Sequence, residues 1–149
     1  MATEANGIYV DTNILAYMAN TKAPQHKLAL EIFRPNSKET QSISSSVMAE
    51  FYSYLTNRNI LANPLTPNEA LYRMRRIYQM PHVSLLSTPP NLFDIWMDLL
   101  EANPVINGQI FDLIHVGIML SHGIRKIYTF NIDDFIHCNQ IEVINPNSL

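Results

Sequence analysis

The sequence lacks several features on which whole classes of protein depend. One cysteine among 149 residues, Cys138, cannot form a disulfide within the chain, which is typical of a reducing compartment. Only four glycines occur, and none is followed by Lys-Ser or Lys-Thr, which excludes a P-loop for phosphate. No apolar run approaches the roughly 18–20 residues that span a membrane, and residues 1–7 lack the basic and apolar segments of a secretory signal. We therefore expect a cytoplasmic protein with no membrane partner.

Charge is also sparse, at 15% of the residues, and the net charge is −3. Proteins that bind nucleic acid tightly without sequence preference usually carry a basic surface, so the charge argues mildly against that class. Catalysis on nucleic acid is still compatible with it, because bound cations can supply positive charge. The length and the hydrophobic fraction of 47% predict one globular domain over residues 1–149, with residues 1–6 as a loose tail.

Strand and helix signals alternate along the chain. Short β-prone runs predict strands at residues 8–10, 41–44, 83–86, 127–129 and 142–144. Apolar residues at helical spacing, with proline and capping signals, predict helices at residues 13–18, 24–35, 46–57, 67–79, 90–101 and 110–122. This alternation predicts an α/β fold, with a mostly parallel sheet covered by helices on both faces. Ligands of such sheets bind beyond the carboxyl ends of the strands.

Four acidic residues do not fit a solvated surface. Asp11 directly follows the first apolar strand, and Asp134 follows the fourth. Glu50 has mostly apolar neighbours in its helix, with no Lys or Arg at position 46 or 54 to pair with it. Asp112 interrupts the apolar segment 110–120, which we expect to be nearly fully buried, and burial of an unpartnered carboxylate costs several kcal/mol. Simpler alternatives remain open, since Asp11 could cap a turn and Asp112 could be a surface acid stabilised by the helix dipole.

A cluster of carboxylates favours metal-dependent chemistry. Carboxylates in one place repel one another unless a cation neutralises them or their pKa values rise. Mg²⁺ and Mn²⁺ prefer oxygen ligands, and a pair of such ions can activate water and stabilise phosphoryl displacement. Zinc is disfavoured, because neither Cys-x-x-Cys nor His-Glu-x-x-His occurs and Asp112 with His115 is a weak pair. We interpret His115 as a core histidine or as one that supports a metal ligand.

The sequence lacks the motifs on which several other catalytic mechanisms depend. No Gly-x-Ser-x-Gly motif is present, and His137 beside Cys138 is a poor candidate for a thiol pair. An aspartyl-phosphate enzyme commonly needs a second Asp two residues after the first, where this chain has Asn13.

Four segments together resemble the PIN-domain ribonucleases, particularly the VapC-like toxins of VapBC-type toxin–antitoxin pairs. The segments are residues 8–15 (IYVDTNIL), 44–50 (SSSVMAE), 111–116 (FDLIHV, with His-Gly ending the helix) and 129–135 (TFNIDDF, followed by VINP). Each segment is short, but they occur in the family's order and cover nearly the whole chain.

The resemblance implies a three-layer α/β/α fold and a Mg²⁺- or Mn²⁺-dependent endoribonuclease that hydrolyses RNA by metal-activated water, leaving a 5′-phosphate. It implies that Asp11 and Asp112 are the main metal ligands, that Glu50 binds metal or orients water, and that Asp134 supplies the remaining carboxylate. The supporting residues would be Thr12, Thr129 and Asn131. Asn131 stands where the family often has Asp, which leaves open whether Asn131 or Asp134 completes the site and whether one ion binds or two.

The resemblance also implies partners. These are an RNA substrate, a second copy of the chain in a homodimer, and a small antitoxin with a basic residue that reaches the acidic pocket. The segments 51–55 and 71–73 would form the antitoxin surface or pack in the core. Two alternatives stay open: a catalytically weak PIN-like module that binds RNA or protein, and another metal-dependent phosphoryl-transfer enzyme, such as a DNA nuclease or a phosphatase.

Overall fold

The computed structural model describes residues 7–35 and 38–149, and the predicted loose tail at residues 1–6 lies outside the described residues. The described residues form one five-stranded sheet with the order β3-β2-β1-β4-β5, in which every neighbouring pair is parallel. The strands are β1 (Gly7–Val10), β2 (Thr40–Ser44), β3 (Val83–Leu86), β4 (Lys126–Tyr128) and β5 (Glu142–Ile144). The predicted α/β fold with a short parallel sheet is thus confirmed.

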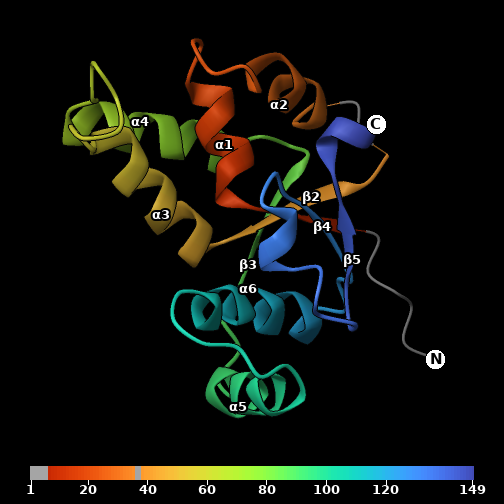
Figure 1. Cartoon of the computed structure of the whole chain (residues 1–149). Coiled ribbons are helices and arrows are strands. Elements are labelled where there is room, and N and C mark those ends of the chain that lie inside the picture. The colour runs from red at the N-terminus through yellow and green to blue at the C-terminus, as the bar shows by residue number, and fades with distance from the viewer. Residues whose placement is uncertain (1–6, 36–37) are drawn as a thin grey trace.

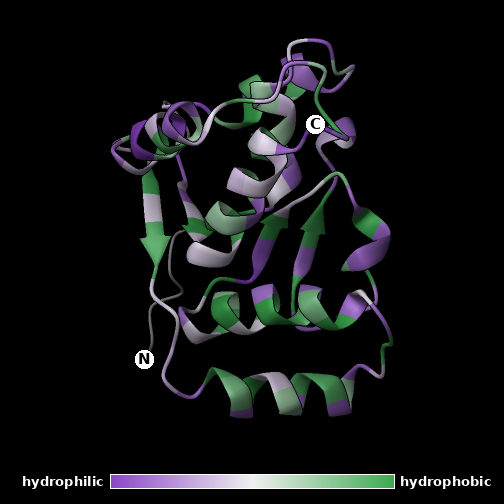
Figure 2. Cartoon of the chain, turned by 90° about the vertical axis from the view of Figure 1, so that its left-hand side faces the viewer, coloured by the Kyte–Doolittle hydropathy of each residue, from purple (hydrophilic) through white to green (hydrophobic). Residues whose placement is uncertain are grey.

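Helices cover both faces of this sheet, which gives the predicted three layers (Figure 1). On one side lie α1 (Thr12–Ala19), α2 (His26–Ile32), α3 (Ser45–Thr56) and α4 (Pro67–Tyr78). On the other side, α6 (Gln109–Ser121) lies against the sheet and α5 (Leu92–Ala102) lies beyond α6 (Figure 2). No helix among the described residues combines the length and the hydrophobicity that crossing a membrane requires.

Local sequence signals explain where several elements begin and end. The capping box predicted at α4 is present: the Thr66 side chain accepts a hydrogen bond from the Glu69 amide, and the Glu69 carboxylate accepts one from the Thr66 amide. Gly123 ends α6 with a φ of 72°, a conformation that favours glycine. The helix predicted to open at Pro24 instead begins at His26, because backbone hydrogen bonds from Ala23 to Asn20 and from His26 to Ala23 form turns there.

The strand order makes the central strand β1 different from the other strands. After β1 the chain builds β2 and β3 on one side of it, and then β4 and β5 on the other. β1 is therefore the topological switch point, the place where ligands bind in open α/β sheets. Ile8, Tyr9 and Val10 of this central strand are completely buried. β4 ends one residue earlier than predicted, so Thr129 lies just beyond its carboxyl end and beside the end of β1.

Candidate functional site

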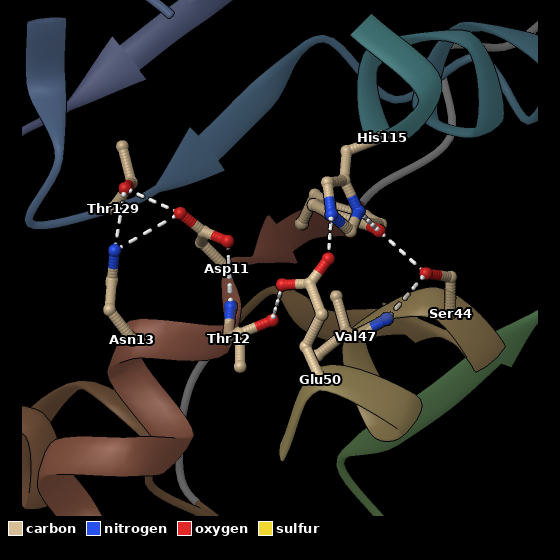
Figure 3. Close-up of polar contacts among 9 residues, drawn as sticks. Asp11, Thr12, Asn13, Ser44, Val47, Glu50, His115 and Thr129 are labelled. Atoms are coloured by element: carbon tan, nitrogen blue, oxygen red, sulfur yellow. Dashed lines mark hydrogen bonds and ion pairs between the residues drawn. The ribbon is translucent and has the colours of Figure 1, made fainter. Parts of the chain in front are cut away.

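Asp11 lies at the switch point, directly after β1, and is buried with 7% of its surface exposed. Its Oδ1 accepts a hydrogen bond of 2.7 Å from the Thr12 amide, so the carboxylate caps α1. Its Oδ2 accepts bonds from the Thr129 hydroxyl at 2.7 Å and from the Asn13 amide group at 3.1 Å (Figure 3). Burial raises the pKa of Asp11, and the Thr129 hydrogen bond opposes the increase. The capping role is therefore correct, but the side chain also reaches the sheet edge where chemistry is expected.

Glu50 approaches Asp11 from α3. Its Oε2 accepts a hydrogen bond of 2.7 Å from the Thr12 hydroxyl, and its Oε1 lies 2.8 Å from His115 Nε2 (Figure 3). Burial opposes ionisation of Glu50, but the bonds from His115 and Thr12 outweigh it and lower the pKa. We expected a buried helix acid, and this was wrong, because 51% of the side chain is exposed. The core-facing side of α3 is filled by Val47, Met48, Phe51 and Leu55.

His115 joins Glu50 to the core from α6. The residue is buried, with 3% exposed, and its Nδ1 lies 2.7 Å from the Tyr9 hydroxyl. Burial disfavours the charged ring, yet the hydrogen bond to Glu50 and its negative charge outweigh this and raise the pKa of His115. The interpretation of His115 as a core histidine is confirmed.

Asp11, Glu50 and His115 form the group best placed to hold an ion. One ligand atom from each lies within 4.8 Å of the others, two being carboxylate oxygens and one an imidazole nitrogen. This donor set fits a divalent cation, with oxygen ligands for Mg²⁺ or Mn²⁺ and a nitrogen that suits transition metals. The segments that supply these atoms are far apart in the sequence and come together at this edge of the sheet.

Asp112 and Asp134 add negative charge to the same region. Asp112 lies in the first turn of α6 and Asp134 in the short 3₁₀ helix η1 (Ile132–Asp134), and both are half-buried. Burial and repulsion by Asp134, Asp11 and Glu50 raise the pKa of Asp112 to about 7. The expectation of near-complete burial at Asp112 was wrong, because Asp112 lies on a half-exposed side of α6, whereas Leu113, directly after it, is buried. The ligand roles of Asp112 and Asp134 stay predictions.

Comparison with known proteins identifies the fold and the family. The PIN domain family matches residues 8–138, which is most of the chain. The chain belongs to the PIN-domain family.

Two curated relatives of this PIN domain are ribonucleases by name. Ribonuclease VapC24 of Mycobacterium tuberculosis is 27% identical over 139 residues, which cover 92% of this chain and 94% of the relative. Ribonuclease VapC33 of the same organism is 29% identical over 96 residues, or 63% of this chain and 67% of the relative.

Solved structures share the fold at lower identity. VapC20 of Mycobacterium tuberculosis, described as a sarcin–ricin loop cleaving toxin, superposes with a TM-score of 0.67 at 20% identity, covering 89% of this chain and 95% of that one. VapBC2 of Rickettsia felis, bound to a promoter DNA fragment, gives 0.64 at 20% identity and covers 93% and 98%. FitAcB of Neisseria gonorrhoeae gives 0.60 at 15% identity and covers 95% and 99%.

Of the supporting residues predicted for this PIN domain, Thr12 bonds both Asp11 and Glu50, whereas Thr129 and Asn131 lie on the Asp11 side. Thr129 is buried, and its hydroxyl oxygen accepts bonds from the Asn131 amide at 3.0 Å and from Asn13 Nδ2 at 3.1 Å. Asn131 is itself exposed and contributes this backbone amide. Sequence reasoning missed Asn13, whose Oδ1 also accepts the Phe130 amide at 3.1 Å and so ties α1 to the loop after β4. Its spacing two residues after Asp11 was the available signal.

Proposed function

We propose that this PIN domain is a Mg²⁺- or Mn²⁺-dependent endoribonuclease that hydrolyses RNA phosphodiester bonds. The observation that carries the proposal is the convergence of the Asp11 and Glu50 carboxylates at the switch point of the sheet, where a ligand atom of each and one of His115 lie within 4.8 Å of one another. The charge of Asp112 and Asp134 beside them supports it, because a cation would relieve the repulsion that raises the pKa of Asp112. The ribonuclease names of two curated relatives support RNA as the substrate class.

The residues that would hold the ion are Asp11, Glu50, Asp112 and Asp134. When bound, the ion would lower the pKa of a water molecule and offset charge on the phosphate. The chain's own contribution is to fix the carboxylates in place before substrate arrives. Thr129 and Asn13 fix one oxygen of Asp11, while Thr12 and His115 each bond one oxygen of Glu50. Such preorganisation avoids reorganisation during the reaction.

The decisive experiment compares Asp11→Asn with Asp94→Asn, a substitution of the same kind at an exposed position of α5. We expect Asp11→Asn to lower RNA cleavage in Mg²⁺ by about 100-fold or more, since loss of a single charge-stabilising group commonly has that effect. Asp94→Asn should cleave as the wild type does, and thermal unfolding should show both variants folded. Cleavage at the wild-type rate by Asp11→Asn would remove this residue from the mechanism.

Matched substrates distinguish this proposal from the alternatives. Single-stranded RNA, DNA of the same sequence and a phosphomonoester are each incubated with Mg²⁺, and RNA alone should be cleaved. Calorimetric titration with Mn²⁺ should show binding in the millimolar range or below. No Mn²⁺ binding together with no cleavage would support a binding module instead.

The proposal extends to the toxin of a toxin–antitoxin pair, since structural relatives include such complexes. Two segments were predicted to form an antitoxin surface or to pack in the core. In segment 51–55, Phe51 and Leu55 pack in the core, and the other residues are partly or fully exposed. Tyr72, in 71–73, is 60% exposed and lines a groove between α1, α2 and α4 whose rim carries Arg73 and Arg76. An acidic, amphipathic segment of an inhibitor would fit there. Growth arrest on expression in bacteria, absent with Asp11→Asn, tests the toxin role.

We also propose that the chain forms a homodimer and that it is located in the cytoplasm, where its RNA substrate would be. Light scattering of the purified protein should give about twice the chain mass of 17.0 kDa.

A further inference from the structure

A continuous line of hydrogen bonds runs through the core of the protein to Glu50. The Val47 amide donates to Ser44 Oγ at 3.2 Å, and Ser44 Oγ lies 2.7 Å from the Tyr9 hydroxyl. The Tyr9 hydroxyl lies 2.7 Å from His115 Nδ1, and His115 Nε2 lies 2.8 Å from Glu50 Oε1 (Figure 3). Tyr9 and Ser44 are completely buried, so these bonds form away from water.

While the His115 ring is neutral, the two ends of this line fix the direction of every bond in it. The Val47 amide can only donate, and the ionised Glu50 carboxylate can only accept, so the neutral His115 ring carries its hydrogen on Nε2. Nδ1 is then an acceptor, Tyr9 donates to it, and the Ser44 hydroxyl donates to Tyr9. In the opposite direction Ser44 Oγ would accept from both the Val47 N–H and the Tyr9 hydroxyl, and the Ser44 hydroxyl hydrogen would have no acceptor in this line. Only the first direction pairs each hydrogen with an acceptor.

We infer that Tyr9 and Ser44 hold His115 in its Nε2–H form, so that His115 positions Glu50 and is not itself a ligand of the ion. The inference rests on the proposed function only for the presence of an ion at Asp11 and Glu50. A histidine that binds metal through Nε2 needs a free lone pair there and usually donates from Nδ1 to an acceptor. Nδ1 lies 2.7 Å from the Tyr9 hydroxyl, and in the direction deduced above Tyr9 donates to it, which is the reverse arrangement.

The result is a carboxylate that is held at both oxygens. His115 bonds Oε1 of Glu50, and Thr12 bonds Oε2 at 2.7 Å. The side chain of Glu50 is 51% exposed, so packing alone does not fix it. Its orientation toward Asp11 therefore depends on these two donors, and the His115 donor depends in turn on Tyr9 and Ser44.

Nitrogen NMR of the histidine ring tests the inference directly. Spectra of ¹⁵N-histidine protein are recorded at alkaline pH, without metal and with saturating Mg²⁺, and His115 is assigned by its loss in His115→Gln. We expect the hydrogen on Nε2 in both samples, and a larger fraction of the Nδ1–H form in Tyr9→Phe than in the wild type, because only Glu50 then favours the Nε2–H form. A hydrogen on Nδ1 in the wild type, or loss of the Nε2 hydrogen on addition of Mg²⁺, would overturn the inference.

Metal affinity provides a second readout through conservative rescue. The amide nitrogen of Gln can replace the Nε2 donor, so His115→Gln should bind Mn²⁺ within a few-fold of the wild type in calorimetry. His115→Ala should bind about 10–100-fold more weakly, which is typical for loss of a group that orients a ligand. His122→Gln at the end of the same helix is the matched control. Equal losses in His115→Gln and His115→Ala would instead indicate that His115 binds the ion.

These readouts separate the inference from the proposed function. If Mg²⁺ binds with the Nε2 hydrogen retained but RNA is not cleaved, the proposed function fails and the inference stands. If RNA is cleaved but the Nε2 hydrogen is lost on Mg²⁺ binding, the proposed function stands and the inference fails.

Discussion

Asp112→Asn should make the metal-free protein more stable while it weakens the metal site. The pKa of Asp112 rises from an ordinary value of 3.8 to about 7 in the folded protein. Between these two values the folded state binds a proton that the unfolded state has released, so the free energy of unfolding falls as pH rises. The penalty is complete above pH 7 and absent below about pH 4. Asn carries no charge, so the Asp112→Asn variant does not have this loss of stability at high pH.

The size of this effect follows from the same two pKa values. Their difference corresponds to about 4 kcal/mol at about 1.4 kcal/mol per pKa unit. Asp112 is only half-buried, and screening by solvent and salt reduces that figure to about 1–2 kcal/mol. For a chain of this length we expect Tm to rise by about 3–6 °C in EDTA at pH 8, and to change little at pH 4.

Addition of Mn²⁺ should reverse the order of stability. An ion that binds only the folded state stabilises it, by about 2.7 kcal/mol at 100 times the dissociation constant. The wild type should gain this stability, and Asp112→Asn should gain little, because a proposed ligand is missing. The assay is thermal unfolding with EDTA or Mn²⁺ at both pH values, with Asp133→Asn at an exposed neighbouring acid as the control. A lower Tm for Asp112→Asn in EDTA at pH 8, or an undiminished gain from Mn²⁺, would refute the reasoning.

Two further substitutions test how the scaffold holds the site. Thr129→Val keeps the shape of the side chain but removes the donor to Asp11 Oδ2 and the acceptor of the Asn131 amide, so urea unfolding should show a loss of about 1–3 kcal/mol. The same substitution at exposed Thr21 should have little effect, and equal losses at both positions would contradict the assigned role. Gly123→Ala should lower stability by about 1–2 kcal/mol without changing Mn²⁺ affinity, because its φ of 72° disfavours a side chain. Gly108→Ala, at a φ of −62° with open space around the added carbon, should be neutral or slightly stabilising, and a loss as large as at Gly123 would argue against backbone strain as the cause.

The order of strands and helices could be predicted because each element carries a local signal. Apolar strands end at polar residues, and the capping box at Thr66 fixes the start of α4. The position of the site followed from a rule of topology, since the carboxyl ends of neighbouring parallel strands meet at one edge of the sheet. The degree of burial of two acidic side chains was predicted wrongly. Apolar neighbours in sequence show that a helix packs, but the burial of Glu50 and Asp112 depends on which side of the helix faces the core.

The hydrogen-bond line behind Glu50 could not be predicted from the sequence. Tyr9 has the pattern of an ordinary core residue in β1, and Ser44 that of a helix cap. Nothing in either pattern shows that their hydroxyls meet, or that Tyr9 contacts a histidine 106 positions away. Such contacts depend on the register between β1 and β2 and on the placement of α6, both of which are set by tertiary packing.

Three of the four carboxylates in the cluster, those of Asp11, Glu50 and Asp112, differ in the direction or the cause of their pKa shifts. Hydrogen bonds from His115 and Thr12 lower the pKa of Glu50, so this side chain stays ionised, whereas burial raises the pKa of Asp11 in spite of the donors around it. At Asp112, burial and repulsion by the neighbouring acids together raise the pKa to about 7, which favours a proton on this residue when no cation is present. A cation that entered the cluster would displace this proton, because a carboxylate must be ionised to bind metal. Metal binding and proton release are therefore coupled at Asp112, while the hydrogen-bonded pair keeps its orientation in both states.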